Sequence, residues 1–294
     1  WKRLVVLMGL VLLLGWSVDL KDKLTFSKEA APRLAVVSAV MIDADSGKTI
    51  YTSNSKEPLP PASMSKMMTE IIVLDSIQAG AARWDDPVRT SDYASRVVGA
   101  QMGLIKGQTV TVKELFDAMA IHSANDATVS LAEYIAGTEA RFVDKMNQKA
   151  QEIGLSSATY FANATGLSSE DLANFATAAA DGETVMSAED VAQLAQYLIQ
   201  MHPEVLSVTK QAAAGSGANA GLLTTNEMLP GQRFGTKGND GLKTGFTERA
   251  GYCFTGTTKI GGRRYITVVM GASTPEGRFE ETKKLLAYAE RTAI

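Results

Sequence analysis

The sequence is poor in the residues that bind transition metals and form disulfides. Its 294 residues include one cysteine, Cys253, and two histidines, His122 and His202. An intramolecular disulfide is therefore impossible, and the chain cannot supply the four Cys or His ligands of a structural zinc site. Because Cys253 lies in a strand-like run, we interpret it as a buried, unreactive thiol.

The sequence also lacks an excess of either charge. It has 29 Lys and Arg against 32 Asp and Glu, a net charge of −3, and no basic run longer than a pair such as Arg263-Arg264. A protein that binds nucleic acid needs a basic patch or stripe, so we expect no nucleic-acid partner. The hydrophobic fraction of 45% and the charged fraction of 21% are typical of a globular chain.

One apolar run stands out, and it is short. Lys2-Arg3 precede residues 4–16, which carry no charge, and the run stops before Asp19. A spanning helix needs about 20 apolar residues, whereas a basic start and a shorter apolar run are typical of a secretory signal. We predict export, with residues 1–20 as a signal peptide or a retained membrane anchor, 21–33 as a linker and 34–294 as the folded domain.

The order of secondary-structure patterns predicts the fold class. Residues 34–42 and 48–52 are strand-like, and so are 252–260 and 263–271, which flank the hairpin signal Gly261-Gly262. The middle third has helical periodicity, and a last helix is expected over 276–292. We therefore predict an α/β (α+β) fold, in which strands from both ends of the chain form one antiparallel sheet flanked by helices, with a helical subdomain.

Ser63 and Lys66 are the first candidate catalytic pair. Residues three apart at the start of a helix share one face, so the lysine amine lies beside the serine hydroxyl and can accept its proton. The helix N-terminus also favours developing negative charge. The same spacing occurs at Ser53-Lys56 and Ser207-Lys210, but only Ser63 follows a proline-rich segment and precedes a long apolar helix.

Two further motifs carry polar side chains suited to a peptide substrate. Ser123-Ala124-Asn125 follows a helical stretch and offers a hydroxyl for proton relay and an amide for a peptide carbonyl. The neighbouring His122 has no identifiable orienting Asp, and we interpret it as a bystander. Lys243-Thr244-Gly245 begins a strand-like stretch, where the lysine and threonine can bind a carboxylate and the glycine permits close approach.

Each motif alone has an ordinary structural explanation, such as a helix cap or an exposed strand. As an ordered set, S-x-x-K, S-x-N and K-T-G are typical of class A β-lactamases and penicillin-binding proteins. The chain resembles that superfamily and, through the segments 59–69, 163–167 and 241–253, is similar to low-molecular-mass D-alanyl-D-alanine carboxypeptidases. The resemblance covers residues 36–288 and implies a β-lactamase/transpeptidase-like fold.

The resemblance implies a two-step serine mechanism outside the cytoplasm. Ser63 attacks the bond between two terminal D-alanines, Lys66 accepts its proton, and Ser123 relays a proton to the leaving amine. The backbone N–H groups of Ser63 and Phe246 stabilise the oxyanion, and water releases the acyl-enzyme. The implied substrate-binding residues are Asn125, Lys243, Thr244, Gly245, Phe246 and Thr247.

The implied partners are peptidoglycan stem peptides ending in D-Ala-D-Ala, β-lactams as covalent inhibitors, and the membrane surface through the N-terminal segment. No metal and no organic cofactor are implied. One departure from the family pattern is Ala124, where Gly or Asp is usual.

Three alternatives stay open at this point. A serine β-lactamase of class A needs a glutamate in an E-x-x-L-N loop, and Glu170-Asp171-Leu172-Ala173-Asn174 is a near match with Ala in place of Leu. A non-catalytic penicillin sensor and a D,D-endopeptidase are the others.

Overall fold

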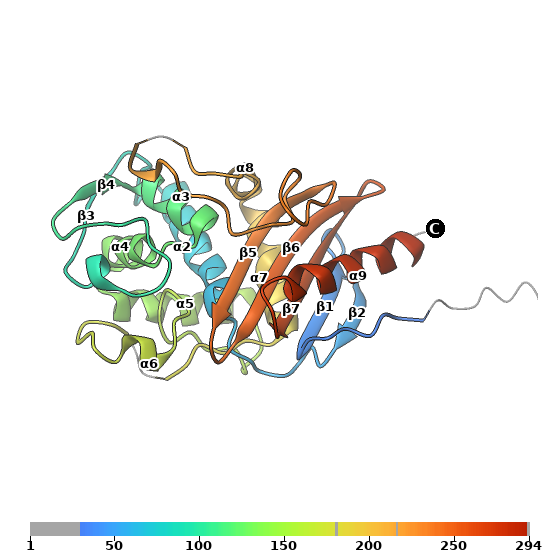
Figure 1. Cartoon of the computed structure of the whole chain (residues 1–294). Coiled ribbons are helices and arrows are strands. Elements are labelled where there is room, and N and C mark those ends of the chain that lie inside the picture. Colours follow the sequence, from blue (N-terminus) through green and yellow to red (C-terminus); the bar gives the residue numbers. More distant parts are fainter. Residues whose placement is uncertain (1–29, 180–181, 216, 293–294) are drawn as a thin grey trace, which may run out of the picture.

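The centre of the molecule is one five-stranded antiparallel sheet with the strand order β2-β1-β7-β6-β5 (Figure 1). The structure, a computed structural model, describes residues 30–179, 182–215 and 217–292. β1 pairs with β7, so strands from the two ends of the chain lie side by side as predicted. The strands span Ser38–Asp43 (β1), Thr49–Ser53 (β2), Asn239–Thr247 (β5), Gly251–Ile260 (β6) and Arg263–Ala272 (β7).

The β6–β7 hairpin turns at Gly261-Gly262, as the sequence predicts. Their φ angles are 56° and 84°, in the left-handed region that a two-residue type I′ turn requires and that glycine adopts without steric cost. The two strands then pair from Ile260 and Arg263 onward. Cys253 is buried in β6, which agrees with its interpretation as a structural thiol.

Alternate side chains of the sheet contact different helical layers, because successive strand residues point to opposite faces. Met41 lies in an apolar cluster with α9 (Gly277–Thr292), whereas Val40 lies in the main core on the side of α7 (Ala188–Met201). Figure 1 shows α9 on one face of the sheet and α7 behind the other. The sheet is thus covered on both faces.

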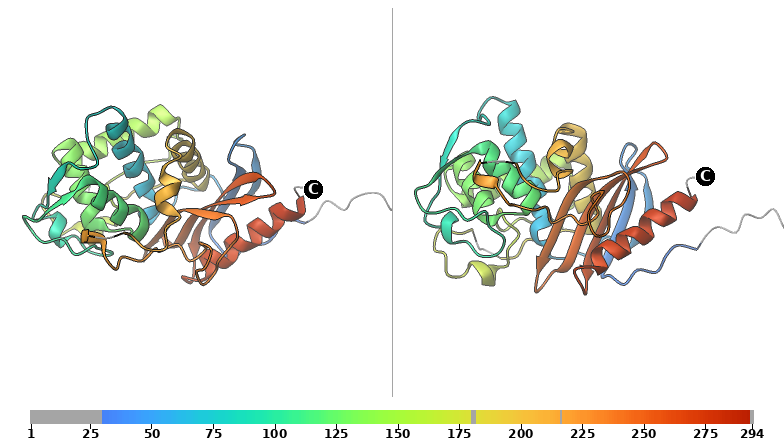
Figure 2. Two further views of the ribbon diagram at one scale, coloured as in Figure 1. Left: turned by 90° about the horizontal axis from the view of Figure 1, so that it is seen from above. Right: turned by 45° about the horizontal axis from the view of Figure 1, so that its top comes forward.

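The segment between β2 and α7 forms most of the predicted helical subdomain (Figure 2). At its centre α2 contacts α3, α4, α5 and α7 and is buried from Lys66 to Leu74. A helix buried on all sides is normally apolar all round, so the two buried charged residues, Lys66 and Glu70, need an explanation. The remaining elements are η1 (Ala62–Ser65), α2 (Lys66–Gln78), β3 (Pro87–Arg89), η2 (Ala94–Arg96), β4 (Thr109–Thr111), α3 (Val112–His122), α4 (Asn125–Ala136), α5 (Glu139–Ile153), α6 (Ser169–Leu172), α8 (Val205–Thr209) and η3 (Gly217–Asn219).

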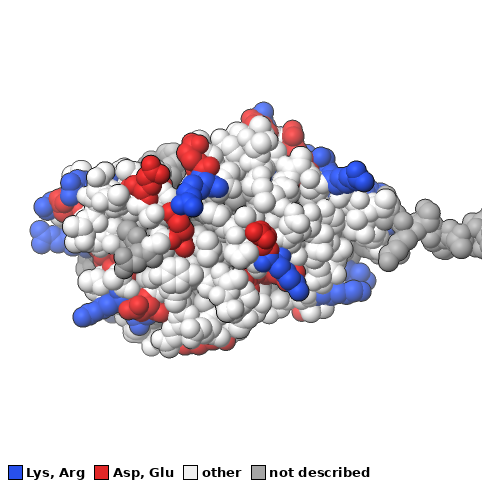
Figure 3. All heavy atoms as spheres, turned by 90° about the horizontal axis from the view of Figure 1, so that it is seen from below, with Lys and Arg blue, Asp and Glu red and all other residues white. Residues whose placement is uncertain are grey.

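The predictions for the N-terminal 29 residues, the signal or anchor and most of the linker, lie outside the described residues. Among the residues that are described, no helix has the length and apolar character to cross a membrane. Acidic and basic side chains are interspersed on the face drawn in Figure 3, which fits the balanced composition of the sequence.

Candidate active site

Ser63 lies in a tight turn rather than in the first turn of an α-helix. The turn η1 is a 3₁₀ helix in which the Met64 N–H donates to the Pro61 carbonyl, and α2 begins only at Lys66. Ala62 has φ 49°, a left-handed conformation that is strained for a residue with a Cβ atom. The α-helix that we predicted to start at Ser63 therefore starts three residues later, at Lys66. The left-handed Ala62 and the 3₁₀ turn occupy the residues before it.

The Lys66 amine is completely buried and lies among three oxygen atoms. Its Nζ is 2.8 Å from Ser63 Oγ, 2.7 Å from Asn125 Oδ1 and 2.8 Å from the Thr165 carbonyl oxygen. Burial, with the nearby positive charge of Lys243, holds the pKa of Lys66 well below its usual value. A neutral amine there donates to Asn125 and Thr165 and keeps its lone pair for the proton of Ser63.

Asn125 is held in place by a loop that precedes α3. Its Nδ2 donates to the Val98 carbonyl at 2.6 Å, which leaves Oδ1 for Lys66. Asp126 fixes the same loop, since its carboxylate accepts the N–H groups of Met102, Gly103 and Leu104. The amide of Asn125 is therefore oriented before any substrate arrives.

Ser123 lies at the junction of α3 and α4 and has φ 65°. A left-handed serine is uncommon, and such strain concentrates at functional sites. Its side chain is 6% exposed, and among the described residues its hydroxyl has no hydrogen-bond partner. The structure thus brings Ser123 to the site region through its neighbour Asn125, without a direct bond to Lys66.

The segment 163–167 supplies the third neighbour of Lys66. Asn163 Oδ1 accepts from the N–H groups of Thr165 and Gly166, which folds the segment into a compact turn. Glu139 accepts the Ala164 N–H at 3.0 Å, and this ties the turn to α5. The Thr165 carbonyl is therefore aimed at Lys66 by buried hydrogen bonds on both sides.

Lys243 and Thr244 lie on β5, one of the two edge strands of the five-stranded sheet. Lys243 is 1% exposed and its Nζ is 3.2 Å from the Thr244 carbonyl oxygen. Burial lowers the pKa of Lys243, while the negative charge of Glu70 opposes that shift. Thr244 Oγ1 donates to Thr225 Oγ1 at 2.6 Å, and the Thr225 N–H donates to the Ile121 carbonyl at the end of α3.

Gly245 lies against the turn that carries Ser63. A Cβ atom on Gly245 would be 2.6 Å from the Pro61 carbonyl oxygen, so only glycine allows β5 to lie this close to η1. We predicted close approach of substrate here, and the structure shows close approach of the protein's own backbone. Phe246 is 42% exposed and stacks on Tyr252, and Thr247 Oγ1 accepts the Ala250 N–H.

The three predicted motifs are therefore brought together. A hydrogen bond joins Lys66 to Asn125, and the packing of Gly245 on Pro61 joins the third motif to the first. Among the described residues, no hydrogen bond links the other candidate residues to this cluster: Ser53 ends β2, Ser207 lies in α8, and His122 Nδ1 is 2.9 Å from the Leu223 carbonyl oxygen. Glu170 is exposed on α6.

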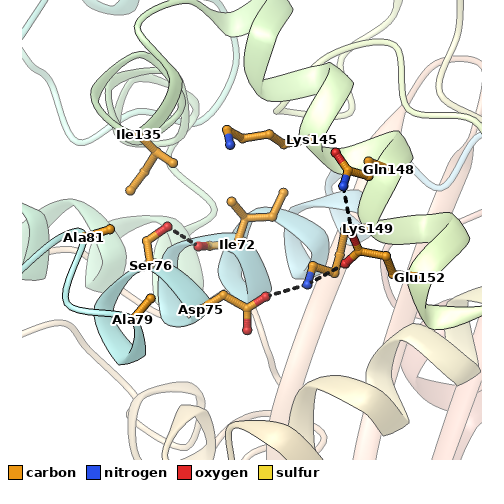
Figure 4. A pocket seen from close by; sticks show the side chains of 10 residues that line it. All are labelled: Ile72, Asp75, Ser76, Ala79, Ala81, Ile135, Lys145, Gln148, Lys149 and Glu152. Atoms are coloured by element: carbon orange, nitrogen blue, oxygen red, sulfur yellow. Dashed lines mark hydrogen bonds and ion pairs between the residues drawn. The ribbon is translucent and has the colours of Figure 1, made fainter.

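A separate surface cleft of about 290 Å³ lies at the opposite end of α2 (Figure 4). Asp75 and Ser76 of α2 line it, and Lys149 and Glu152 of α5 face them. Lys149 pairs with both carboxylates, at 2.9 Å from Asp75 and 3.0 Å from Glu152, so these charges are satisfied internally. The cleft contains none of the motif residues.

Several residues that contact the site were not identified as functional from the sequence. Arg278 comes from α9, its Nη1 lies 3.4 Å from the Gly245 carbonyl oxygen, and its guanidinium lies over the Tyr252 ring. Thr165 acts through a backbone atom, and Thr225 through a contact that depends on the fold. Two of these residues left a signal in the sequence: Glu70 is a charged residue within the apolar stretch that follows Lys66, and Thr165 lies in the segment 163–167 that carries part of the resemblance.

Comparison with known proteins gives the family. The D-alanyl-D-alanine carboxypeptidase family (peptidase S11) matches residues 25–274. The D-alanyl-D-alanine carboxypeptidase DacF of Bacillus subtilis (strain 168) is 39% identical over 259 residues, which are 86% of this chain and 61% of DacF. This chain therefore spans less than two thirds of the length of DacF.

Solved structures show the same fold. A peptidoglycan synthesis regulatory factor (PBP3) from Streptococcus pneumoniae has a TM-score of 0.82 at 36% identity, over 89% of this chain and 73% of that one. Penicillin-binding protein D2 from Listeria monocytogenes, in its cefotaxime-bound form, has a TM-score of 0.77 at 34% identity, over 88% of this chain and 99% of that one. With the family match over most of its length, the chain belongs to the D-alanyl-D-alanine carboxypeptidase family.

Proposed function

We propose that this chain is a serine-type D-alanyl-D-alanine carboxypeptidase that removes the terminal D-Ala from peptidoglycan stem peptides. One observation carries the proposal: the Lys66 Nζ, buried and with a lowered pKa, lies 2.8 Å from Ser63 Oγ. A serine hydroxyl becomes a nucleophile when such a base accepts its proton. The family of the chain and the activity of relatives such as DacF support the same reaction.

Acylation proceeds with Ser63 as the nucleophile. Its Oγ forms a bond to the carbonyl carbon of the penultimate D-Ala while its proton passes to Lys66. The oxyanion accepts hydrogen bonds from the backbone N–H groups of Ser63 and Phe246. Collapse breaks the C–N bond, and Ser123 relays a proton from Lys66 to the leaving D-Ala amine. Asn125 holds the substrate backbone.

The terminal carboxylate of the substrate binds along β5. Lys243 supplies the positive charge, Thr247 supplies a hydroxyl donor, and Thr244 supplies a second one when its hydroxyl turns from Thr225 to the carboxylate; Gly245 keeps this strand close to Ser63. Arg278 adds a second positive charge beneath the strand, because its Nη1 contacts the Gly245 carbonyl. This arrangement favours a substrate with a free C-terminus over an internal peptide bond.

Deacylation transfers the acyl group from Ser63 to water and regenerates the free enzyme. A β-lactam acylates the same serine, and the Listeria relative has been solved in cefotaxime-bound and ampicillin-bound forms. The β-lactamase alternative has weaker support, because Glu170 is exposed on α6 instead of lying among the buried site residues.

The proposed reaction takes place on the outer side of the cytoplasmic membrane, where stem peptides are found. Export through residues 1–20, and contact of that segment with the membrane surface, are part of the proposal. The domain that carries the reaction is residues 34–294.

The test is incubation of the protein with a stem pentapeptide, with detection of free D-Ala and the tetrapeptide by mass spectrometry. We expect both products with wild type and neither with Ser63→Ala. Ser207→Ala, a change at a serine with the same spacing to a lysine, is the matched control and keeps the activity. A wild type that labels with penicillin but releases no D-Ala from the pentapeptide contradicts the carboxypeptidase assignment, and cleavage of a cross-linked dimer would then favour the endopeptidase.

A further inference from the structure

Glu70 is a buried carboxyl group that the proposed mechanism does not use. It is 1% exposed, and neither carboxylate oxygen has a hydrogen-bond partner among the described residues. Burying an ionised carboxylate without a hydrogen bond costs folding free energy, so nearby positive charges are needed to stabilise its ionised form. Packing alone does not account for a carboxyl group here, because the residues around it on α2 are mostly apolar and Lys66 is the one other buried charged side chain of this helix.

Two buried lysines, Lys66 and Lys243, act electrostatically on the Glu70 carboxyl group. Lys66 is one helical turn earlier on the same face of α2, and Lys243, on β5, has an electrostatic effect on Glu70. Both lysines are 1% exposed or less. Burial raises the pKa of Glu70, and the positive charges of Lys243 and Lys66 lower it. The three groups therefore form one buried cluster with two positive charges and one negative charge when all are ionised.

The buried and half-buried charged side chains on the elements around α2 have partners of their own, whereas Arg141, Asp144 and Lys145 of α5 are exposed. Asp126 of α4 accepts three backbone N–H groups of its loop, and Lys149 of α5 is paired with two carboxylates. Others are likewise paired: Glu114 of α3 with Thr111, Asp117 of α3 with Lys113, His122 of α3 with Leu223, Glu133 of α4 with Ser91, Glu139 of α5 with Tyr93, Glu189 of α7 with Ser55, and Asp190 of α7 with Ser156. Arg278 of α9 acts on Lys243 and lowers its pKa.

The proposed function sets opposite demands on the two lysines. Lys66 must be neutral to accept the proton of Ser63, whereas Lys243 must be charged to bind a carboxylate. Two buried amines alone repel each other and both lose protons readily. We propose that Glu70 is a positioning residue that acts through its charge: the ionised carboxylate balances one of the two lysines and sets the pH range in which Lys66 is neutral while Lys243 stays charged. This inference rests on the proposed function.

The sign of the effect follows from the charges. An ionised Glu70 raises the pKa of Lys66 and of Lys243. Replacement by Gln keeps the volume and removes the charge, so both lysines lose their protons at lower pH. The acid limb of the activity profile, which reports neutral Lys66, moves to lower pH, and so does the alkaline limb, which reports charged Lys243.

The experiment is the rate of acylation by a fluorescent penicillin between about pH 5 and pH 10, for wild type, Glu70→Gln and Glu281→Gln. Glu281 is a matched control, a 5% exposed carboxylate on α9 paired with Lys284. We expect the whole Glu70→Gln profile to shift by about one pH unit toward acid, with the control unchanged. A loss of packing alone lowers rates without moving the limbs.

A Glu70→Gln profile that superimposes on wild type overturns the inference and leaves the proposed function intact. A wild type that reacts with penicillin at no pH overturns both. If Glu70→Gln fails to fold, the carboxyl ¹³C chemical shift of Glu70 in the wild type decides the matter. An ionised carboxylate across the active pH range supports the inference, and a carboxyl that stays neutral throughout overturns it.

Discussion

Lys66 Nζ and Asn125 Oδ1 are 2.7 Å apart, although 59 residues separate them in the sequence. This hydrogen bond joins the base proposed for Ser63 to the amide proposed to hold the substrate. It is buried, and the Asn125 side chain is fixed at its other end by the Val98 carbonyl. Replacing either residue therefore removes a hydrogen bond that positions the side chain of the other.

Replacement of Lys66 by Met tests the proton acceptor. Met has a similar length and no basic group, so Ser63 loses the group that takes its proton. We expect the rate of acylation by penicillin to fall by about 10²–10⁴-fold. Lys56→Met, in one of the other segments with the same serine–lysine spacing, is the control and keeps the wild-type rate. Equal rates for Lys66→Met and wild type would show that another group activates the serine.

Glu139 is expected to matter for activity without reaching the substrate. Its carboxylate accepts hydrogen bonds from Tyr93 Oη, the Ala164 N–H and the Ala179 N–H, and so holds the turn that aims the Thr165 carbonyl at Lys66. Glu139→Ala leaves these buried donors unpaired, and we expect a loss of about 3 kcal/mol of unfolding free energy by chemical denaturation. Acylation slows as well, because Lys66 loses a fixed neighbour.

Tyr93→Phe is a milder change at the same hydrogen-bond network, for comparison with Glu139→Ala. It removes one of the three hydrogen bonds and keeps the two that hold the backbone. We expect about 1 kcal/mol of destabilisation and an acylation rate close to wild type. An unchanged stability for Glu139→Ala contradicts the role given to this carboxylate.

The sheet, the final helix and the order of the motifs are predictable from the sequence, because they depend on local periodicity and turn residues. Gly261-Gly262 is an example: two adjacent glycines between strand-like runs have one common use. The contacts of Thr165, Thr225 and Arg278 are not predictable this way. Each contact depends on how distant segments pack. Thr165 also acts through its backbone carbonyl, which every residue has, and Thr225 through a hydroxyl, which is common to many residues.

The turn around Ser63 shows the same limit. The proline-rich approach is visible in the sequence, but nothing in it predicts that Ala62 adopts φ 49° or that α2 begins only at Lys66. The packing of Gly245 on Pro61, which belongs to another part of the chain, accompanies that conformation. Sequence motifs locate the chemistry here, and tertiary packing fixes its geometry.

Arg278 is predicted to strengthen binding of substrates with a free carboxylate. Its guanidinium is partly buried beneath β5, beside the Gly245 carbonyl and the Tyr252 ring. Arg278→Leu removes a positive charge near the proposed carboxylate site, and we expect KM for the pentapeptide to rise by about tenfold with a smaller change in kcat. Arg233→Leu, at an exposed arginine paired with Glu276, is the control with unchanged KM. A kcat loss at constant KM for Arg278→Leu would assign the residue to a different step.

Gly245→Ala is predicted to disable the site by displacing the nucleophile rather than by touching the substrate. The added Cβ atom would lie 2.6 Å from the Pro61 carbonyl oxygen and 3.2 Å from Ala62 Cβ, and a backbone oxygen cannot move aside as a flexible side chain can. Either β5 or the turn of Ser63 must therefore shift. A shift of about 1 Å lowers the acylation rate on the order of 10²-fold. Gly215→Ala is the matched control, because its Cβ atom would meet no atom of the described residues beyond its chain neighbours within 4 Å, and its φ lies outside the left-handed region. We expect slow penicillin acylation with Gly245→Ala and a wild-type rate with Gly215→Ala. If Gly245→Ala acylates normally, the turn of Ser63 tolerates displacement, and the close packing of β5 on Pro61 is not what positions the serine.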